Sequence, residues 1–469
     1  MFVAYLVSHA FAVAMGIASL LLMTRVISSR RTSQSALAWL LAIAFVPFAA
    51  IPLYLLIGSR KFPRRAKQPA PESERLVAAA AQKEGATSSM ARMLSSSGVA
   101  PPRPGNAFEL LTTGEVAYAR LMGLVRGAEQ TIDLTMFILG DDATGRAIID
   151  ALVERASNGV SVRVILDAVG SSGSRRRAAR ALCAVGADVR AFMPFTHSPI
   201  RGRTNLRSHR KLAVIDREHV FAGGMNLAEE YMGPPMPPGS EPRWRDVAAV
   251  ASGNVAADAE ALFESDWAFC GGAKRTARDG DASAREISVA RGDALVQIVP
   301  SGPDMTTDTI YDMFLTGIFA SRQRIAIVTP YYVPDEVLQH ALVLAARRGV
   351  RTEIVVPARS NHRLADVARR ALIRELRAAG VVVHYYARGM VHAKAMVIDD
   401  AFAYVGSPNF DMRSLFLNYE NALCVYSPGA IGEIRAFIDG LIAECPADEP
   451  PEGRSWLAEQ VARLLAPEL

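Results

Sequence analysis

A short pattern of basic and acidic residues occurs twice in this chain. Both copies have the form His-x-Lys followed by an aspartate seven residues after the histidine: His209, Lys211 and Asp216, then His392, Lys394 and Asp399. The chain has only eight histidines, so two sets with the same spacing indicate a common function rather than chance.

The spacing predicts which side chains act together. Side chains at positions i and i+2 of a strand point to the same face, so His209 and Lys211 share a face, as do His392 and Lys394. A neutral imidazole is a nucleophile or base, and its protonated form is an acid. A lysine beside it suits a tetrahedral anion better than a metal, which favours converging His, Cys or carboxylate ligands. Each motif therefore predicts half of a phosphate site, with no metal and no cofactor.

Each motif begins a strand-like run and is followed by a glycine turn that ends in asparagine. The turns are Gly223-Gly224-Met225-Asn226 and Gly406-Ser407-Pro408-Asn409. Asn226, Asn409 and Ser407 are therefore predicted to bind substrate phosphate oxygens. A serine hydroxyl occurs only in the second turn, so the two half-sites are not equivalent.

The motifs belong to a longer internal repeat. Gly159 and Gly349 each precede an apolar run with strand character, and a second pair of segments matches around Gly186 and Gly380. We expect a duplicated α/β domain at 108–270 and 286–446, whose pseudo-two-fold symmetry brings both His-x-Lys strands to one interface.

The remaining segments are predicted from composition and spacing. Residues 62–107 are rich in Pro, Ala and Ser and are interpreted as a linker with one short helix at 73–84. Residues 447–469 have helical apolar spacing and are predicted to form a C-terminal docking helix, with a membrane-surface helix as the alternative.

The N-terminal region is strongly apolar. Residues 2–24 and 35–57 carry no Lys, Arg, Asp or Glu, and 23 residues of helix span roughly 35 Å, enough to cross a bilayer. A buried core helix and a signal peptide are the alternatives, but no basic residue precedes the first run. We predict a two-helix transmembrane anchor over residues 1–61. Five basic residues follow the second span and three lie between the spans, which favours a cytoplasmic catalytic part.

Composition narrows the partner only to a class. The net charge of +5 and the sequence pI near 9.1 fit an anionic partner, either a lipid surface or a nucleic acid. No aromatic and basic strip for stacking bases is seen, so no nucleic acid is expected. The four cysteines are scattered and contain no C-x-x-C motif, so they predict neither a zinc ribbon nor a dithiol site.

At this point the chain resembles the phospholipase D superfamily, which has a duplicated HxKxxxxD motif, and most closely its bacterial cardiolipin synthases with an N-terminal two-helix anchor. Further segments carry the resemblance, namely Ala38–Leu41, Tyr54–Gly58, Glu230-Tyr231, Trp244–Asp246, Asp266-Trp267, Val299–Asp304, Thr329–Asp335 and Asn418–Glu420. The resemblance implies two phospholipase D-like α/β sandwich domains in a pseudo-two-fold arrangement, preceded by two transmembrane helices.

The resemblance also implies a reaction, a place and a set of roles. Two phosphatidylglycerols give cardiolipin and glycerol through a phosphohistidine, at the bacterial inner membrane and in contact with other anionic phospholipids. One histidine attacks phosphorus; His209 is assigned this role by family habit, and the reverse assignment stays open. Glu230 and Glu420 are the predicted carboxylates that orient the imidazoles. Asp216 and Asp399 either join the catalytic set or fix the fold. A hydrolytic phospholipase D, another phosphatidyltransferase and a superfamily nuclease are the alternative enzymes.

Overall fold

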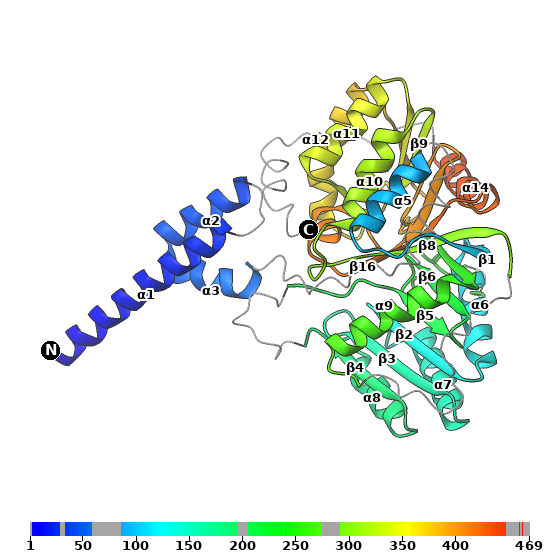
Figure 1. Cartoon of the computed structure of the whole chain (residues 1–469), viewed down its shortest axis with the longest axis horizontal. Coiled ribbons are helices and arrows are strands. Elements are labelled where there is room, and N and C mark those ends of the chain that lie inside the picture. Colours follow the sequence, from blue (N-terminus) through cyan, green and yellow to red (C-terminus); the bar gives the residue numbers. More distant parts are fainter. Residues whose placement is uncertain are drawn as a thin grey trace.

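The structure is a computed structural model of the whole chain. It describes residues 2–28, 33–58, 86–194, 205–237, 239–273, 291–446, 459 and 462. The N-terminal helices lie apart from a larger α/β body that contains both motifs (Figure 1).

Fourteen strands form one continuous sheet, with seven strands from each half of the chain. From the centre of the sheet outward, the seven strands of one half follow in the same arrangement as the seven of the other half. In that order the first half contains β1 (Arg103–Leu111), β7 (Ala248–Ser252), β6 (His219–Gly223), β5 (Leu212–Ile215), β2 (Thr131–Met136), β3 (Ser161–Asp167) and β4 (Asp188–Phe192). The second half contains β8 (Ala294–Ser301), β16 (Glu420–Val425), β14 (Phe402–Gly406), β13 (Ala395–Ile398), β9 (Arg324–Val328), β11 (Arg351–Pro357) and β12 (Val382–Tyr386). Every strand of this sheet thus has a counterpart, which confirms the predicted duplication.

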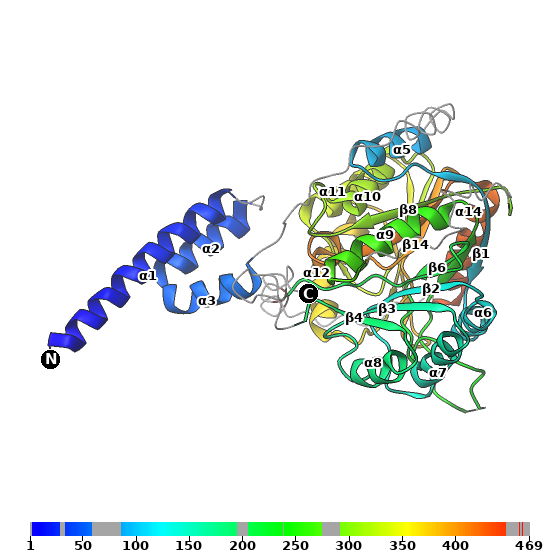
Figure 2. The ribbon, with the colours of Figure 1, turned by 60° about the horizontal axis from the view of Figure 1, so that its bottom comes forward.

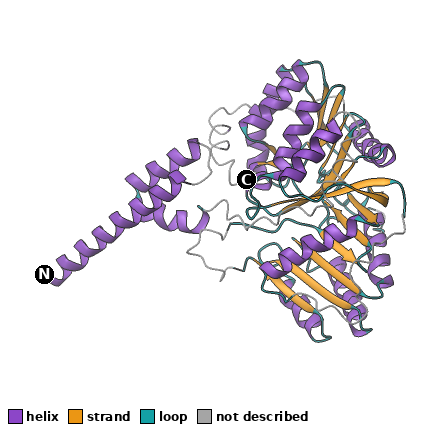
Figure 3. Cartoon of the chain, viewed as in Figure 1, coloured by secondary structure: helices purple, strands orange, loops and turns teal. Residues whose placement is uncertain are grey.

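Helices cover the sheet on both faces (Figure 3). The helices of the body are α5 (Ala86–Ser96), α6 (Gly114–Gly127), α7 (Ala143–Ser157), α8 (Arg175–Cys183), α9 (Val255–Phe269), α10 (Thr309–Ala320), α11 (Glu336–Arg347), α12 (Arg363–Ala378), α13 (Met412–Phe416) and α14 (Pro428–Glu444). A two-stranded sheet joins β10 (Tyr332–Val333) to β15 (Phe410–Asp411). In each half, three neighbouring strands run parallel and the His-x-Lys strand pairs antiparallel beside them.

The alternation of side chains along the two His-x-Lys strands places the halves against each other. Leu212 and Val214 of β5 share a buried apolar cluster with Ala395 and Val397 of β13. The intervening residues of both strands point to the opposite face, where α6–α8 cover the first half and α10–α12 cover the second. The two motifs therefore begin at the interface between the halves, as the predicted pseudo-two-fold symmetry implies.

The N-terminal region forms three helices rather than the two that we predicted. They are α1 (Phe2–Ser28), α2 (Ser33–Phe45) and α3 (Pro47–Ile57), packed on one another through Leu22, Val26, Ile43 and Tyr54. The prediction of one unbroken span over 35–57 is wrong, because the helix stops at Val46 and restarts at Pro47, whose ring lacks an N–H and favours the first turn of a helix. Among the described residues, one helix, His9–Ser28, is long and apolar enough to cross a membrane.

The segment before the first half also differs from the prediction. The helix expected at 73–84 lies outside the described residues, whereas α5 packs Met90 and Leu94 into the core of the second half beside α10. Strand β1 begins at Arg103, inside the predicted linker. Figure 2 shows α5 lying over α10 and α11. The exact residues at which the chain divides into domains stay a prediction.

The C-terminal tail is described at two positions only. Glu459 is buried and pairs with Arg374 of α12, and Ala462 is buried in the core of the second half. These contacts fit a tail that docks on the body, while the rest of the predicted helix lies outside the described residues.

Candidate active site

Each histidine is held by the backbone of the opposite half. The amide of His209 donates to the carbonyl of Tyr419 at 2.8 Å, and the amide of His392 donates to the carbonyl of Arg245 at 2.7 Å. Isolated β-bridges join Ser208 to Tyr419 and Arg245 to Val391. The site is therefore built only when both halves are in place.

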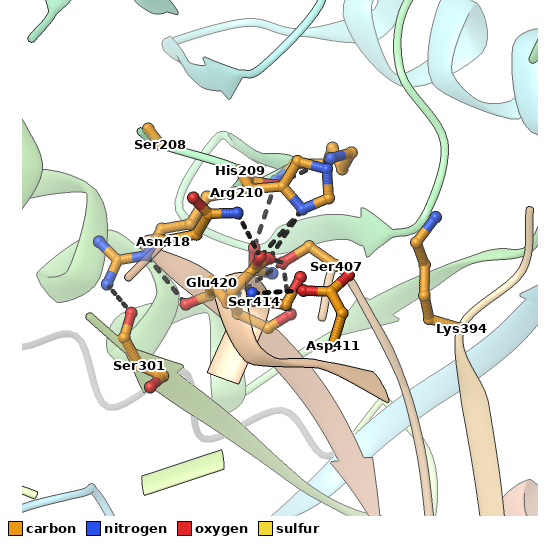
Figure 4. A network of polar contacts seen from close by, with 12 residues as sticks. Ser208, His209, Arg210, Ser301, Lys394, Ser407, Asp411, Ser414, Asn418 and Glu420 are labelled. Atoms are coloured by element: carbon orange, nitrogen blue, oxygen red, sulfur yellow. Dashed lines mark hydrogen bonds and ion pairs between the residues drawn. The ribbon is translucent and has the colours of Figure 1, made fainter. Parts of the chain in front are cut away.

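A carboxylate from the opposite half contacts each imidazole. Nδ1 of His209 lies 3.0 Å from both carboxylate oxygens of Glu420, and Nδ1 of His392 lies 2.7 Å from Oδ2 of Asp246. Since an ionised carboxylate only accepts, the hydrogen of each neutral ring must lie on Nδ1, which leaves the Nε2 lone pair for chemistry. Figure 4 shows Glu420 next to His209.

Glu420 belongs to a wider network of polar contacts. The hydroxyl of Ser407 donates to Oε2 of Glu420, and Nδ2 of Asn418 donates to Oε1 at 3.3 Å (Figure 4). Ser407 also accepts from the amide of Asn421 at 3.0 Å. The hydroxyl hydrogen of Ser407 is thus used on Glu420, so the serine predicted to bind phosphate supports the carboxylate in this structure.

The two lysines are buried beside the histidines. Nζ of Lys211 donates to the carbonyl of His209 at 2.9 Å, and Nζ of Lys394 donates to the carbonyl of His392 at 2.5 Å. Nζ of Lys394 also lies 3.0 Å from Nε2 of His392. Two cations in a dry site provide a strong field for an anion.

Burial changes the protonation of these groups. It lowers the pKa of His209 to about 4 and, together with Lys394, that of His392 to about 3. Burial also lowers the pKa of Lys211 to about 7 and that of Lys394 to about 8. Both imidazoles are therefore neutral near pH 7, as a nucleophile at phosphorus requires.

The two carboxylates remain ionised despite their burial. Burial alone raises the pKa of Glu420, but its interactions with His209 and Lys211 and the hydrogen bond from Ser407 outweigh burial, so the pKa lies below its ordinary value. For Asp246, burial is likewise outweighed by His392 and Lys394. Each imidazole thus has an ionised carboxylate at its Nδ1.

The asparagines of the glycine turns are buried near the histidines. Oδ1 of Asn226 accepts from the amide of Ile138 at 3.3 Å, and its side chain hydrogen-bonds to that of Tyr231. The side chain of Asn409 bonds to the carboxylate of Asp411, and among the described residues its Oδ1 has no hydrogen-bond partner. A phosphate-binding role for both asparagines stays a prediction.

Asp216 and Asp399 contact backbone amides at hairpin turns rather than the histidines. The carboxylate of Asp216 accepts from the amides of residues 129–131 at 2.7–2.9 Å. The carboxylate of Asp399 accepts from the amides of residues 322–324 at 2.8–2.9 Å. Both aspartates have φ near +50°, a conformation that Asp tolerates better than most residues. These contacts fit the second of the two predicted roles, in which the aspartates stabilise the fold and do not take part in catalysis.

Asp246 is a site residue that was not predicted from the sequence. It holds the position on His392 that was predicted for Glu230. Glu230 was predicted to orient an imidazole, but the carboxylate on His392 is Asp246. A signal was present in the repeat: Asp246 lies two residues before β7, and Glu420 begins the matching strand β16. Gly224 explains the shorter side chain, because a Cβ there would lie 2.3 Å from Oδ1 of Asp246, whereas the second half has Ser407 and the longer Glu420.

The donor set of the site is not that of a metal centre. Within the described residues, no cluster of three or more His, Cys, Asp or Glu side chains could hold a metal ion. The expectation that no metal or cofactor takes part stays a prediction.

Two family models match the chain. The model described as "Cardiolipin synthase, PLD-like domain" matches residues 121–267 and 315–442, one stretch in each half. The model described as "Phospholipase_D-nuclease N-terminal" matches residues 17–59. The chain belongs to the cardiolipin synthase family of the phospholipase D superfamily.

Members of the family resemble the chain over nearly its full length. Cardiolipin synthase A of Pseudomonas aeruginosa is 32% identical over 461 residues, covering 93% of this chain and 91% of the relative. Cardiolipin synthase 1 of Bacillus cereus is 28% identical over 422 residues, covering 86% and 82%. Phosphatidylserine synthase of Haemophilus influenzae Rd KW20 has the same fold, with a TM-score of 0.57 at 16% identity over 77% of this chain and 95% of the other.

Proposed function

We propose that this member of the family is a cardiolipin synthase: it transfers a phosphatidyl group from one phosphatidylglycerol to another and releases glycerol. The observation that carries the proposal is the paired site, in which two neutral imidazoles are each held by a carboxylate of the opposite half. Relatives named cardiolipin synthase match nearly the full chain and support the same conclusion.

The reaction runs in two displacements at phosphorus. In the first, Nε2 of one imidazole attacks phosphorus and the bond from phosphorus to the glycerol oxygen breaks. The other imidazole, carrying a proton, donates it to the departing oxygen. In the second, this imidazole takes the proton from a hydroxyl of the second lipid, whose oxygen attacks phosphorus and breaks the phosphorus–nitrogen bond. Protons and electron pairs therefore balance over the cycle.

The acid must hold a proton, although both imidazoles are neutral without substrate. A bound phosphodiester adds a negative charge beside them, and a nearby negative charge raises the pKa of an imidazole. The carboxylates of Glu420 and Asp246 stabilise the resulting cation through Nδ1. Lys211 and Lys394 stabilise the charge on the non-bridging oxygens, together with Asn226 and Asn409.

The lysines take the part that Mg²⁺ plays in other phosphoryl transfers, so no metal is required. EDTA should leave the turnover of the purified enzyme unchanged, as measured by cardiolipin formation. Strong inhibition by EDTA, reversed by added metal, would contradict the role given to the lysines.

The substrates are phospholipids in a bilayer, and the N-terminal region supports a membrane location. We place the protein in the bacterial inner membrane with two N-terminal passes within residues 1–61, the first made by α1 and the second by α2 and α3 together, and with the catalytic body on the cytoplasmic side. The apolar helix His9–Ser28 and the excess of basic residues after the second predicted span support this arrangement. Other anionic phospholipids are bound at the surface, and no nucleic acid is a partner.

Incubation of the purified full-length protein with phosphatidylglycerol in lipid–detergent micelles tests the proposal. The expected products are cardiolipin and free glycerol in equal amounts. Phosphatidic acid as the sole product would instead indicate a hydrolytic phospholipase D. Cleavage of DNA without lipid turnover would indicate a nuclease.

A further inference from the structure

The two histidines lie on matching backbone frames, so the residues beside them can be compared position by position. The carbonyl of Arg207, two residues before His209, accepts from the amide of Tyr419 at 2.9 Å. The carbonyl of Met390, two residues before His392, accepts from the amide of Arg245 at 2.8 Å. Arg207 and Met390 therefore occupy equivalent positions.

A second pair of hydrogen bonds extends the match. The amide of Asn418 donates to the carbonyl of Arg413 at 3.0 Å, and the amide of Trp244 donates to the carbonyl of Glu230 at 2.9 Å. Arg413 and Glu230 also follow the asparagine of each glycine turn by four residues. Arg413 is thus equivalent to Glu230, and Asn418 is equivalent to Trp244.

The equivalent positions differ strongly in charge. The residues beside His209, here called the His209 flank, are Arg207, Arg413 and Asn418. The residues beside His392, here called the His392 flank, are Met390, Glu230 and Trp244. The ring centroid of Trp244 lies 5.4 Å from that of His392. The site is therefore symmetric in the lysines at its centre but carries two guanidinium groups on one flank and a carboxylate on the other.

The two arginines of the His209 flank lie close to each other. Nη2 of Arg413 donates to the carbonyl of Asn205 at 2.5 Å, two residues before Arg207. Arg207 is buried, its Nη1 donates to the carbonyl of Met193 at 2.9 Å, and it lies 3.8 Å from Asp167. Burial lowers the pKa of Arg207, the charge of Asp167 offsets part of that change, and the charge of Arg413 adds a smaller lowering.

This arrangement concentrates positive charge and attracts a further anion. Like charges repel, and a buried cation is stabilised chiefly by a partner of opposite charge. The carboxylate of Asp167 is shared, because it also accepts from the amides of Val169, Gly170 and Ser208. Arg413 lies on α13, and the equivalent residue on the His392 flank is Glu230. This pair of arginines is therefore present on one side of the reacting phosphate only.

We propose that Arg207 and Arg413 form an anion subsite for the phosphate of the acceptor lipid, an inference that rests on the proposed function. The acceptor phosphatidylglycerol carries its own phosphate three carbons from the hydroxyl that attacks. While the reacting phosphate lies between the lysines, the acceptor lies beside the imidazole that takes its proton, opposite the imidazole that attacks. A second phosphate on the His209 flank therefore goes with the assignment in which His392 attacks phosphorus and His209 is the base. Two residues of extended chain span roughly 7 Å. The distance from His209 to Arg207 therefore matches the separation between the hydroxyl and the phosphate of the acceptor headgroup. Arginine forks bind phosphate oxygens in pairs.

A comparison of two acceptors tests the subsite. Transfer to phosphatidylglycerol gives cardiolipin and uses a charged acceptor. Exchange of labelled free glycerol into phosphatidylglycerol uses a neutral acceptor and the same chemistry. The variants are Arg207→Met, which installs the residue of the other flank, and Arg413→Gln, on the partly exposed helix α13. Arg176→Met, an exposed arginine of α8, is the matched control.

The expected result is selective. Loss of a charge-assisted contact to phosphate should lower cardiolipin formation at low phosphatidylglycerol by about 10- to 100-fold and leave glycerol exchange within about threefold. The control should match the wild type in both assays. An equal fall in both reactions for both variants, or unchanged cardiolipin formation, would overturn the subsite. A wild-type enzyme that exchanges glycerol but forms no cardiolipin would instead overturn the proposed function.

Discussion

The carboxylate of Asp246 offers the sharpest test of how the site is built. In the variant Asp246→Asn, the side chain keeps its size but loses its charge. The bond from Nδ1 of His392 to Oδ2 of Asp246 is 2.7 Å long, and both groups are buried. The variant therefore removes the one anion that fixes this ring and stabilises its protonated form.

The size of the effect follows from the burial of the pair. Breaking a buried, charged hydrogen bond costs about 3 to 5 kcal/mol. If that energy is lost from the transition state, turnover falls by about 10²- to 10⁴-fold, at 1.36 kcal/mol for each factor of ten. The amide can also present an N–H to Nδ1 and thereby favour the wrong ring tautomer, which acts in the same direction.

The assay is the initial rate of cardiolipin formation by the purified variant in mixed micelles. Asp150→Asn, an exposed position on α7, is the matched control and should keep wild-type turnover. Circular dichroism and thermal unfolding would establish that both variants are folded. A folded Asp246→Asn enzyme with more than about a tenth of wild-type turnover would refute the role assigned to this carboxylate.

Three further predictions concern the surroundings of the site. Burial lowers the pKa of Lys211 to about 7, so the cation is lost from the free enzyme as pH rises. The kcat/KM for phosphatidylglycerol should therefore fall above about pH 7 to 8. A kcat/KM that stays flat up to about pH 9 would contradict this. Asp216→Ala removes the acceptor of three backbone amides, so unfolding in urea should show about 2 kcal/mol less stability, with kcat per folded enzyme unchanged; a large loss of kcat would indicate a catalytic role. Gly224→Ser places a Cβ 2.3 Å from Oδ1 of Asp246, so turnover should fall at least about tenfold, and a fully active variant would refute the crowding.

The duplicated fold could be predicted from the sequence because its signals are local. The His-x-Lys spacing places both side chains on one face of a strand, and matching apolar runs recur around Gly159 and Gly349. Asp216 and Asp399 were left with two roles, since a spacing of five residues after a lysine is compatible with a turn as well as with a site.

The second predicted span shows where composition is not enough. Residues 35–57 are apolar throughout, and hydropathy does not register the break at Val46. The proline at position 47 was visible in the sequence, but proline occurs inside membrane helices as well as at their ends. Composition therefore predicted the apolar stretch correctly and its continuity wrongly.

The carboxylates of the site depend on contacts between distant parts of the chain. Asp246 is separated from His392 by 146 residues, and Glu420 is separated from His209 by 211. Nothing local in the sequence distinguishes Asp246 from other acids near the end of the first half. The repeat aligns Asp246 with Glu420, but its contact with His392 becomes visible only when the two halves are packed together.

The covalent step through histidine can be measured directly. Phosphatidylglycerol labelled with ³²P would be mixed with excess enzyme, quenched in alkali, where phosphohistidine survives, and the labelled peptide would be identified. We expect label on one histidine, either His209 or His392, that is lost on acid treatment and disappears when fresh phosphatidylglycerol is added before the quench. Cardiolipin formation without any labelled enzyme, in rapid-quench samples taken within one turnover, would contradict a two-step transfer through histidine.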